Sequence, residues 1–309
     1  MIIVNPHNWL VKDIGEAADY LKSKGIDGVQ FSPITYCKET SSETNASKEW
    51  WKLYQPYSFK RLENRLGNEN QVRAAVENLH KNGIKAFTDS VVRHVAGEDR
   101  PVQPGCLPQP HPNVDKELLQ YLAKQDYTNV NSRYDIIHGC WGMPRLDYNN
   151  KNLQEQVYIP HFDKLLYDIG FDGVRLDMGK HFALPNEGGT FWTNVIGRYT
   201  EKFIYAECIN TPTHLLNEYT KYCKVLTDQY AQMGTGSVRF FESHDTYWHP
   251  EWSDTSNLNT DQRIKLFEEL ANKYNNIMLF LRPYDDILNH PRFTEIATNR
   301  NCKAKQNIG

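Results

Sequence analysis

The sequence predicts a single (β/α)8 TIM barrel, and three observations support this fold class. The first is length: 309 residues suit one barrel of roughly 200–400 residues. The second is a unit that recurs in the stretches 20–33, 78–94 and 165–181, each of which is typical of a helix, a glycine and a buried strand. The third is the number of candidate strands, because eight are enough to close a barrel.

The recurring unit contains its own helix stop. Gly25, Gly83 and Gly170 each follow a segment with helical character, where a glycine in the left-handed conformation ends a helix. The short apolar runs after these glycines do not alternate with polar residues, which indicates strands buried on both faces. Repeated helix–strand units favour a parallel sheet with right-handed crossovers.

The remaining candidate strands follow in chain order. Together with the three strands of the recurring unit they are 2–5, 203–207, 224–228, 237–242 and 276–281. An open doubly wound sheet is the alternative, but no glycine-rich phosphate loop follows the first strand, so the barrel is favoured. Between 224–228 and 237–242 there are too few residues for a full helix.

A long insertion rich in proline and glycine, residues 95–147, separates the strands near 89 and 173. An insertion of this size on a βα-loop is usually functional. We therefore predict a catalytic barrel made of residues 1–94 and 148–309, with 95–147 as an inserted domain.

Composition excludes some classes of function. The net charge is only −3 and there is no long basic run, so nucleic acid is not an expected partner. No apolar run approaches the ~20 residues of a membrane span, so no membrane association is expected. The first residues lack a signal-peptide pattern, which suits a cytoplasmic chain or a secreted one whose signal was removed. The six cysteines form no close-set pair of the zinc-binding type, and the oligomeric state is not indicated.

Charged residues collect where the predicted strands end. They are Asp89 and His94, then Arg175, Asp177, Lys180 and His181, then Glu207, and finally Glu242, His244 and Asp245. Any one of them alone would more often be a helix cap or an ion-pair partner. In a barrel, however, the carboxyl ends of all strands meet at one rim, where active sites lie. Carboxylates gathered at such a rim indicate glycoside chemistry, in which one attacks the anomeric carbon and another donates a proton.

The motifs at these strand ends resemble those of a known family. "FTDSVVRH", "GVRLDMGKH", "YAECIN" and "FFESHD" resemble the four sequence regions of the α-amylase family of glycoside hydrolases, family 13. "WWKLYQPYSFKRLENRLGNENQ" resembles the stretch before the first region in animal-type and related bacterial α-amylases, and "MPRLDYNN" resembles the fifth region, at the end of the inserted domain B. The resemblance extends from about residue 1 to 285.

The resemblance implies a catalytic trio. Asp177 would be the nucleophile, Glu207 the general acid and base, and Asp245 the residue that stabilises the transition state through sugar hydroxyls. Arg175 precedes Asp177 by two residues and so lies on the same face of the strand. We expect its guanidinium to keep Asp177 ionised.

The resemblance also implies a binding cleft for an α-glucan polysaccharide or a maltooligosaccharide. His94 and His244 would bind the sugar in the subsite of the cleaved bond, and Tyr54 would stack on it. The donor side would be lined by Trp50, Trp51 and Gln55, although a buried core position is the alternative for the tryptophan pair. Lys180 and His181 would contact the acceptor side.

These features predict a retaining hydrolase that cuts internal α-1,4-glucosidic bonds of starch or glycogen. "KH" at 180–181 favours α-1,4 cleavage, whereas "MPRLD" at 143–147 resembles the maltogenic and neopullulanase-like branch. The alternatives are therefore a transglycosylating or neopullulanase-like enzyme, and a catalytically weak pseudoenzyme that only binds glucan. The complete trio favours an enzyme.

No cofactor is expected. In the family, an asparagine just before the first-region histidine and an aspartate of the fifth region bind calcium; here the first position is Arg93, while the second is retained as Asp147. We expect Arg93 to repel calcium and to pair with Asp147, the alternative being that Arg93 points to solvent and calcium binds other carboxylates. Chloride is not expected, because Ser243 stands where animal-type enzymes have a chloride-binding asparagine. The family's C-terminal β-sandwich is expected to be absent, since only a short tail follows the last strand.

Overall fold

A closed barrel of eight parallel strands forms the centre of the molecule, as predicted. The computed structural model describes residues 1–38, 49–99, 106–125, 132–228, 237–249 and 254–306. Around the barrel the strand order is β1-β10-β9-β8-β7-β6-β5-β2. The bounds are β1 Ile2–Pro6, β2 Gly28–Phe31, β5 Lys85–Ser90, β6 Gly173–Leu176, β7 Tyr205–Glu207, β8 Lys224–Asp228, β9 Val238–Phe240 and β10 Asn276–Leu281. A small hairpin pairs β3 (Glu63–Asn64) with β4 (Gly67–Asn68).

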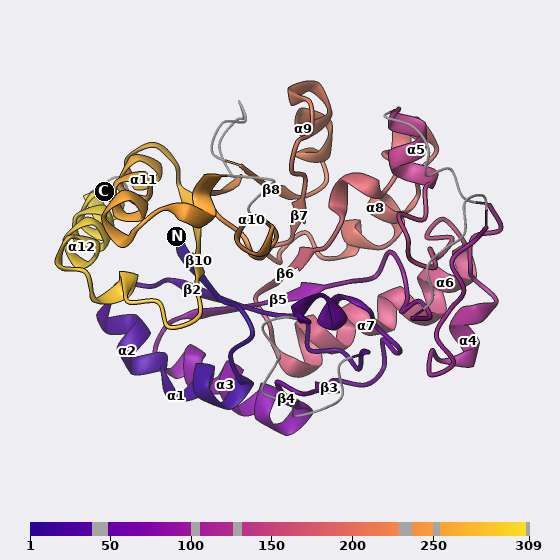
Figure 1. Cartoon of the computed structure of the whole chain (residues 1–309), viewed down its shortest axis with the longest axis horizontal. Helices are drawn as coiled ribbons and strands as arrows, with labels where there is room; N and C mark the ends of the chain where they lie inside the picture. The colour runs from indigo at the N-terminus through magenta and orange to yellow at the C-terminus, as the bar shows by residue number, and fades with distance from the viewer. Residues whose placement is uncertain (39–48, 100–105, 126–131, 229–236, 250–253, 307–309) are drawn as a thin grey trace.

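Helices cover the outside of the barrel (Figure 1). The α-helices are α1 Val11–Glu16, α2 Ala18–Ser23, α3 Glu69–Lys81, α4 Lys116–Leu119, α5 Arg133–His138, α6 Lys151–Leu153, α7 Ile159–Asp163, α8 Phe191–Asn194, α9 Thr213–Tyr219, α10 His244–Trp248, α11 Thr260–Lys273 and α12 Pro291–Gln306. Wider π turns continue α6 and α7, namely η2 Gln154–Tyr158 and η3 Lys164–Ile169. The short 3₁₀ turns are η1 Trp50–Tyr54, η4 Gly179–His181, η5 Pro185–Glu187, η6 Ile196–Arg198, η8 Asp254–Asn257 and η9 Ile287–Asn289. Within the described ranges, none of these helices combines the length and the apolar character that a membrane crossing requires.

The predicted glycine stops are confirmed. Gly25, Gly83 and Gly170 have φ of 79°, 63° and 93°, in the left-handed region that glycine tolerates best. A strand with a mostly buried run follows each of them, β2, β5 and β6 respectively. The local chemistry of a glycine after a helix therefore sets where three of the eight strands begin.

In the part of the chain that the structure describes, two separate apolar cores hold the barrel together. The inner core lies between the strands and consists of Ile3, Phe87, Tyr205, Leu226, Val238, Phe240 and Met278. The larger outer core joins the other face of the strands, for example Val29 and Val174, to the helices. Both faces of each strand are thus buried, which explains why the strand sequences do not alternate.

The inserted segment, residues 95–147, lies at one side of the barrel, to the right in Figure 1, opposite α11 and α12. Its described part contains α4 and α5 and is otherwise irregular. Isolated bridges join His94 to Arg145 and Leu122 to Leu146. That this segment is a domain of its own stays a prediction. The stretch 229–236, where the sequence leaves too little room for a helix, lies outside the described residues.

The inner core yields a stability prediction. Phe87 is fully buried and its ring lies 5.4 Å from that of Phe203 and 5.9 Å from that of Tyr205. Phe87→Ala should lower the free energy of unfolding by about 3–5 kcal/mol, because it leaves a cavity inside the barrel. Urea denaturation measures this change. The control is Leu10→Ala, at a residue 46% exposed, which should change stability by less than about 0.5 kcal/mol. Equal losses of unfolding free energy in the two variants would contradict the placement of Phe87 in a packed inner core.

Candidate active site

A single buried guanidinium, that of Arg175, gathers the acidic residues at the rim. The register of β5 and β6 places Asp89 opposite Arg175. Arg175 Nη1 donates to both carboxylate oxygens of Asp89 at 2.7 Å and to Asp177 Oδ1 at 3.1 Å. Its Nη2 contacts Glu207 Oε1 from β7. One cation therefore contacts three carboxylates from three neighbouring strands.

A tight turn after β6 places Asp177 beside Glu207 at the rim of the barrel. Met178 has a left-handed φ of 52°, and its backbone N–H donates to Glu207 Oε2 at 3.1 Å. At Gly179 a side chain would not fit, since a Cβ there would lie 2.6 Å from Ala206 Cβ and 2.9 Å from Glu207 N. The missing side chain lets the turn pack directly on β7. Strain at Met178 is thus placed beside the two candidate catalysts.

Three carboxylates contact the single guanidinium of Arg175, so one positive charge is shared among several negative ones. Burial raises the pKa of Asp177 well above its usual range; Arg175 opposes this effect, while the charge of Glu207 adds to it. Burial, followed by the charge of Glu207, raises the pKa of Asp245 to about 7. Arg175 therefore acts on Asp177 in the expected direction and favours its ionised form, while burial and the neighbouring carboxylates oppose this effect.

A layer of neutral rings covers one side of the acidic cluster. The imidazole of His244 stacks on His7 with ring centres 4.8 Å apart, and on Tyr54 at 4.9 Å. The Tyr54 hydroxyl donates to Asp89 Oδ2 at 2.9 Å, so this layer is tied to the carboxylates. Burial lowers the pKa of His244 well below its usual range and that of His7 to about 3. Both imidazoles are consequently uncharged at neutral pH.

His94 presents an acceptor nitrogen. Its Nε2 lies 2.8 Å from the Tyr54 carbonyl oxygen, which fixes the proton on that nitrogen. Its Nδ1 is then an acceptor, and this buried atom has no hydrogen-bond partner among the described residues. Burial lowers the pKa of His94 to about 4, so the ring stays neutral.

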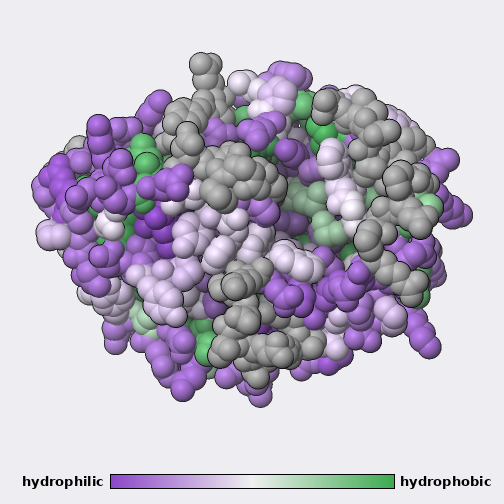
Figure 2. All heavy atoms as spheres, in the orientation of Figure 1, coloured by the Kyte–Doolittle hydropathy of each residue, from purple (hydrophilic) through white to green (hydrophobic). Residues whose placement is uncertain are grey.

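A cleft of about 1210 Å³ opens above these groups, and the hollow right of centre in Figure 2 shows it. Of the residues predicted from the sequence, its walls include Asp177, Glu207, Asp245, Trp50, Trp51, Tyr54, Gln55, His94, Lys180, His181 and His244. Arg175, the remaining predicted residue, is 1% exposed and lies beneath the carboxylates. The structure thus brings together in one site all the residues that sequence reasoning singled out for catalysis and substrate binding.

The two tryptophans differ in what they offer. Trp50 is 8% exposed, and its edge packs on His244 with ring centres 5.0 Å apart. Trp51 is 38% exposed at the rim of the cleft, with Lys52 Nζ 5.8 Å from its ring centre. Trp51 therefore offers an open ring for a sugar, whereas Trp50 mainly supports the His244 imidazole.

On the opposite wall, Lys180 and His181 are held by backbone oxygens. Lys180 Nζ donates to Ile209 O at 2.9 Å, and His181 Nδ1 lies 2.8 Å from Ile136 O. The indole of Trp141, from the inserted segment, lies edge-on to His181 with ring centres 5.4 Å apart. The inserted segment therefore contributes directly to this wall of the cleft.

Sequence reasoning missed several residues of the site, among them His7, which stacks on His244, and Trp141 in the wall of the cleft. His7 directly follows β1, so reading the end of every predicted strand would have found it. Trp141 lies in an irregular segment and has a left-handed φ of 56°, and no periodic pattern of the sequence indicates its position.

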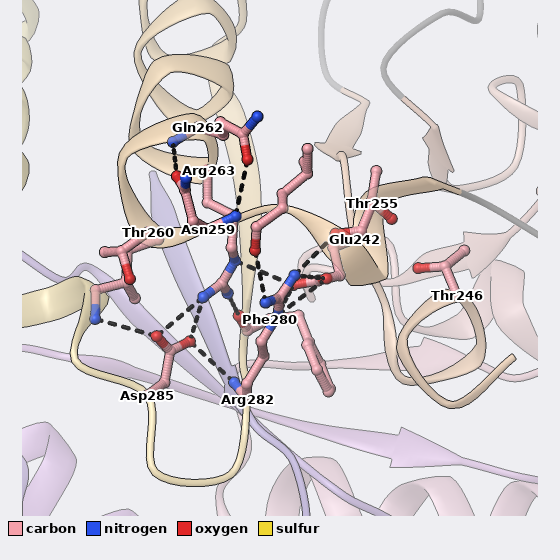
Figure 3. A network of polar contacts seen from close by, with 12 residues as sticks. Glu242, Thr246, Thr255, Asn259, Thr260, Gln262, Arg263, Phe280, Arg282 and Asp285 are labelled. Carbon is pink, nitrogen blue, oxygen red and sulfur yellow. Dashed lines mark hydrogen bonds and ion pairs between the residues drawn. The ribbon is translucent and has the colours of Figure 1, made fainter. Parts of the chain in front are cut away.

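Glu242, also noted at a strand end, belongs to a different cluster. Its carboxylate has no exposed surface and lies between Arg282, whose Nε is 3.1 Å from Oε1, and Arg263, whose Nε is 3.2 Å from Oε2 (Figure 3). Arg263 continues to Asp285, at 2.8 Å. These ion pairs fasten the end of β9 to α11 and to the end of β10. They thereby anchor the segment in which Ser243 caps α10 and places His244 and Asp245.

The predicted pairing of Arg93 with Asp147 is wrong. Arg93 is fully buried and donates to backbone carbonyl oxygens, whereas Asp147 is exposed. The alternative, with Arg93 pointing to solvent, is wrong for the same reason. Among the described residues, no cluster of three or more histidine, cysteine or acidic side chains suits a metal ion. That chloride plays no part stays a prediction.

Comparison with known proteins places this cleft in context. A family profile described as "Alpha amylase, catalytic domain" matches residues 11–259. The pancreatic α-amylase of Sus scrofa is 28% identical over 290 residues, covering 86% of this chain and 55% of that protein. An α-amylase of Clostridium acetobutylicum is 24% identical and is covered over 40% of its length, so the chain spans about half the length of these curated relatives.

Among solved structures, the α-amylase of Geobacillus thermoleovorans complexed with acarbose superposes with a TM-score of 0.72 at 15% identity, covering 97% of this chain and 78% of that one. A variant of α-amylase I from Eisenia fetida in complex with maltohexaose gives a TM-score of 0.69 at 19% identity, covering 91% and 66%. At these identities the likeness concerns the fold.

The raised pKa of Asp245 yields a prediction about stability and pH. Because its pKa rises from 3.8 unfolded to about 7 folded, this carboxyl stabilises the fold only at low pH, and the contribution is lost as pH rises through 7. Asp245→Asn should therefore raise Tm relative to the unsubstituted protein by about 2–4 °C more at pH 8 than at pH 4. Asp19→Asn, at an exposed residue of α2, is the control and should show no such difference. A Tm difference for Asp245→Asn that is independent of pH would contradict the raised pKa.

Proposed function

Since the chain belongs to the α-amylase family of glycoside hydrolases, we propose that it cuts internal α-1,4-glucosidic bonds of starch- or glycogen-type glucans with retention of configuration. The observation that carries this proposal is the contact of one guanidinium with both Asp177 and Glu207. A shared cation keeps the two carboxylates close together, as a retaining mechanism requires.

In the first step, an oxygen of Asp177 attacks the anomeric carbon of the sugar. The bond from that carbon to the leaving oxygen breaks, and the leaving oxygen takes a proton from Glu207. The product is an ester between Asp177 and the sugar. In the second step, Glu207 takes a proton from water, the water oxygen attacks the same carbon, and the ester bond to Asp177 breaks.

Glu207 has to change its contacts to act as the acid. Its two oxygens accept from Arg175 and from the Met178 backbone N–H. We propose that glucan entering the cleft displaces one of these contacts and turns Glu207 toward the bond to be cleaved. Asp245, at the first turn of α10, would then hold sugar hydroxyls as the positive charge develops.

Uncharged rings suit a neutral glucan. His94 and His244 are neutral, and the open ring of Trp51 offers a stacking surface at the rim. Complexes with acarbose and maltohexaose among the structural neighbours support a ligand of this class.

Substitution of the two proposed catalysts tests their roles. Asp177→Asn and Glu207→Gln should each lower kcat on soluble starch by several orders of magnitude, and the double variant should be little worse, because the two residues act as a unit. Circular dichroism and thermal melts check that each variant folds. Glu155→Gln, at an exposed residue of η2, is the control and should keep full activity. Nearly full activity in either single variant would contradict the assignment.

The configuration of the first products tests the reaction class. Proton NMR during starch hydrolysis should show α-anomers first, because two displacements at one carbon restore its configuration. β-Anomers appearing first would contradict the proposal. Parallel incubation with pullulan and with maltooligosaccharides separates the alternatives: cleavage of α-1,6 bonds indicates a neopullulanase-like enzyme, and products longer than the substrate indicate transglycosylation. Binding without turnover would identify a pseudoenzyme.

A further inference from the structure

Arg93 occupies an unusual position between the barrel and the inserted segment. Its side chain is 0% exposed, although it carries a full charge. Nε donates to the carbonyl oxygen of His181 at 3.2 Å, and Nη2 donates to those of Ile137 and Gly139 at 2.8 Å each. His181 belongs to the barrel and the other two residues to the inserted segment. One buried cation therefore joins the two parts of the chain.

The three acceptors are backbone oxygens that need a donor. Ile137 lies in the last turn of α5 and Gly139 just after it, where helix carbonyls have no partner within the helix. Leaving such groups buried and unsatisfied would cost free energy. The planar guanidinium, with donors pointing in several directions, satisfies all three at once.

The surroundings of Arg93 are unfavourable for a second cation. Burial, followed by the charge of Arg145, lowers the pKa of Arg93 to about 10, so the guanidinium still carries its charge at neutral pH. The contacts that Arg93 makes are to neutral carbonyls, and Asp147 is exposed rather than turned toward it. Calcium requires oxygen ligands, usually with carboxylates among them, and here the converging oxygens already bind a cation. The calcium ion that the family resemblance implies does not fit this arrangement.

We infer that the Arg93 guanidinium is a built-in cation that fastens the inserted segment to the barrel in place of calcium, so that neither the fold nor the cleft depends on that metal. Arg93 is thereby a positioning residue for the wall of the cleft. It holds the backbone oxygen of His181, Ile136 O accepts from the imidazole of the same residue, and Trp141 packs on that ring. This inference does not rest on the proposed reaction.

The first experiment adds and removes the metal. Thermal melts and calcium titration calorimetry of the unsubstituted protein should show the same Tm with EDTA and with calcium chloride, and no saturable heat of calcium binding. A fall in Tm on chelation that calcium reverses and magnesium does not would overturn the inference. Both readouts are independent of catalysis, so a protein inactive on starch could still meet this prediction, and an active one could fail it.

The second experiment removes the internal cation. Arg93→Ala should lower Tm by about 10 °C, since three charge-assisted hydrogen bonds are lost. Guanidinium chloride at non-denaturing concentrations should restore part of this loss, whereas urea, which has a similar shape but no charge, should not. Arg198→Ala, at an exposed residue of η6, and the unsubstituted protein should gain nothing from guanidinium. An unchanged Tm in Arg93→Ala, or equal rescue by urea, would overturn the inference.

A conservative variant keeps the test decisive if Arg93→Ala does not fold. Arg93→Lys retains the charge but can direct its donors from only one nitrogen, so it should have a Tm below that of the unsubstituted protein and above any value measurable for Arg93→Ala. If starch is hydrolysed, this variant should raise KM more than it lowers kcat, because the wall of the cleft shifts while the carboxylates stay in place. A Tm and a KM equal to those of the unsubstituted protein would contradict the positioning role.

Discussion

The buried contact of Arg175 with three carboxylates is the interaction on which the site depends. Asp89, Asp177 and Glu207 come from three adjacent strands, so the guanidinium also joins β5, β6 and β7 at their carboxyl ends. Removing one partner of a buried ion pair commonly costs about 3–5 kcal/mol, because the remaining charge stays without compensation. The turn at Met178 and Gly179 packs directly against Glu207. This close packing requires the left-handed backbone of Met178 and leaves no room for a side chain at Gly179.

The same cluster weakens the fold that holds it. Burial raises the pKa of Asp89, Asp177 and Asp245, which means that their ionised forms destabilise the folded state. The inner and outer cores supply the compensating stability. A second buried set of ion pairs around Glu242 fixes the segment that carries His244 and Asp245. The stability supplied by the two cores thus offsets the unfavourable burial of charge and the backbone strain at the rim.

Much of this arrangement could be predicted from the sequence, because its determinants are local. Gly25, Gly83 and Gly170 mark helix ends, and the strands that follow bring their terminal charges to one rim. What failed depends on contacts that are not local. The acceptors of Arg93 lie at the end of α5, more than forty residues away, and in the turn η4 after β6, so no spacing indicates them. Likewise, the position of Arg175 two residues before Asp177 does not reveal how many other carboxylates share its charge.

The most direct measurement of the central claim is to trap the covalent intermediate on the residue that Arg175 holds. Incubation with a 5-fluoro-α-glucosyl fluoride, followed by proteolysis and mass spectrometry, locates any sugar ester, since the ring fluorine slows both steps while the reactive fluoride leaving group keeps formation of the ester faster than its breakdown. An arrangement in which Asp177 attacks and Glu207 moves the protons predicts one fluoroglucosyl group on the peptide that contains Asp177. An ester on Glu207 or Asp245, or starch hydrolysis with inverted products and no ester, would contradict it.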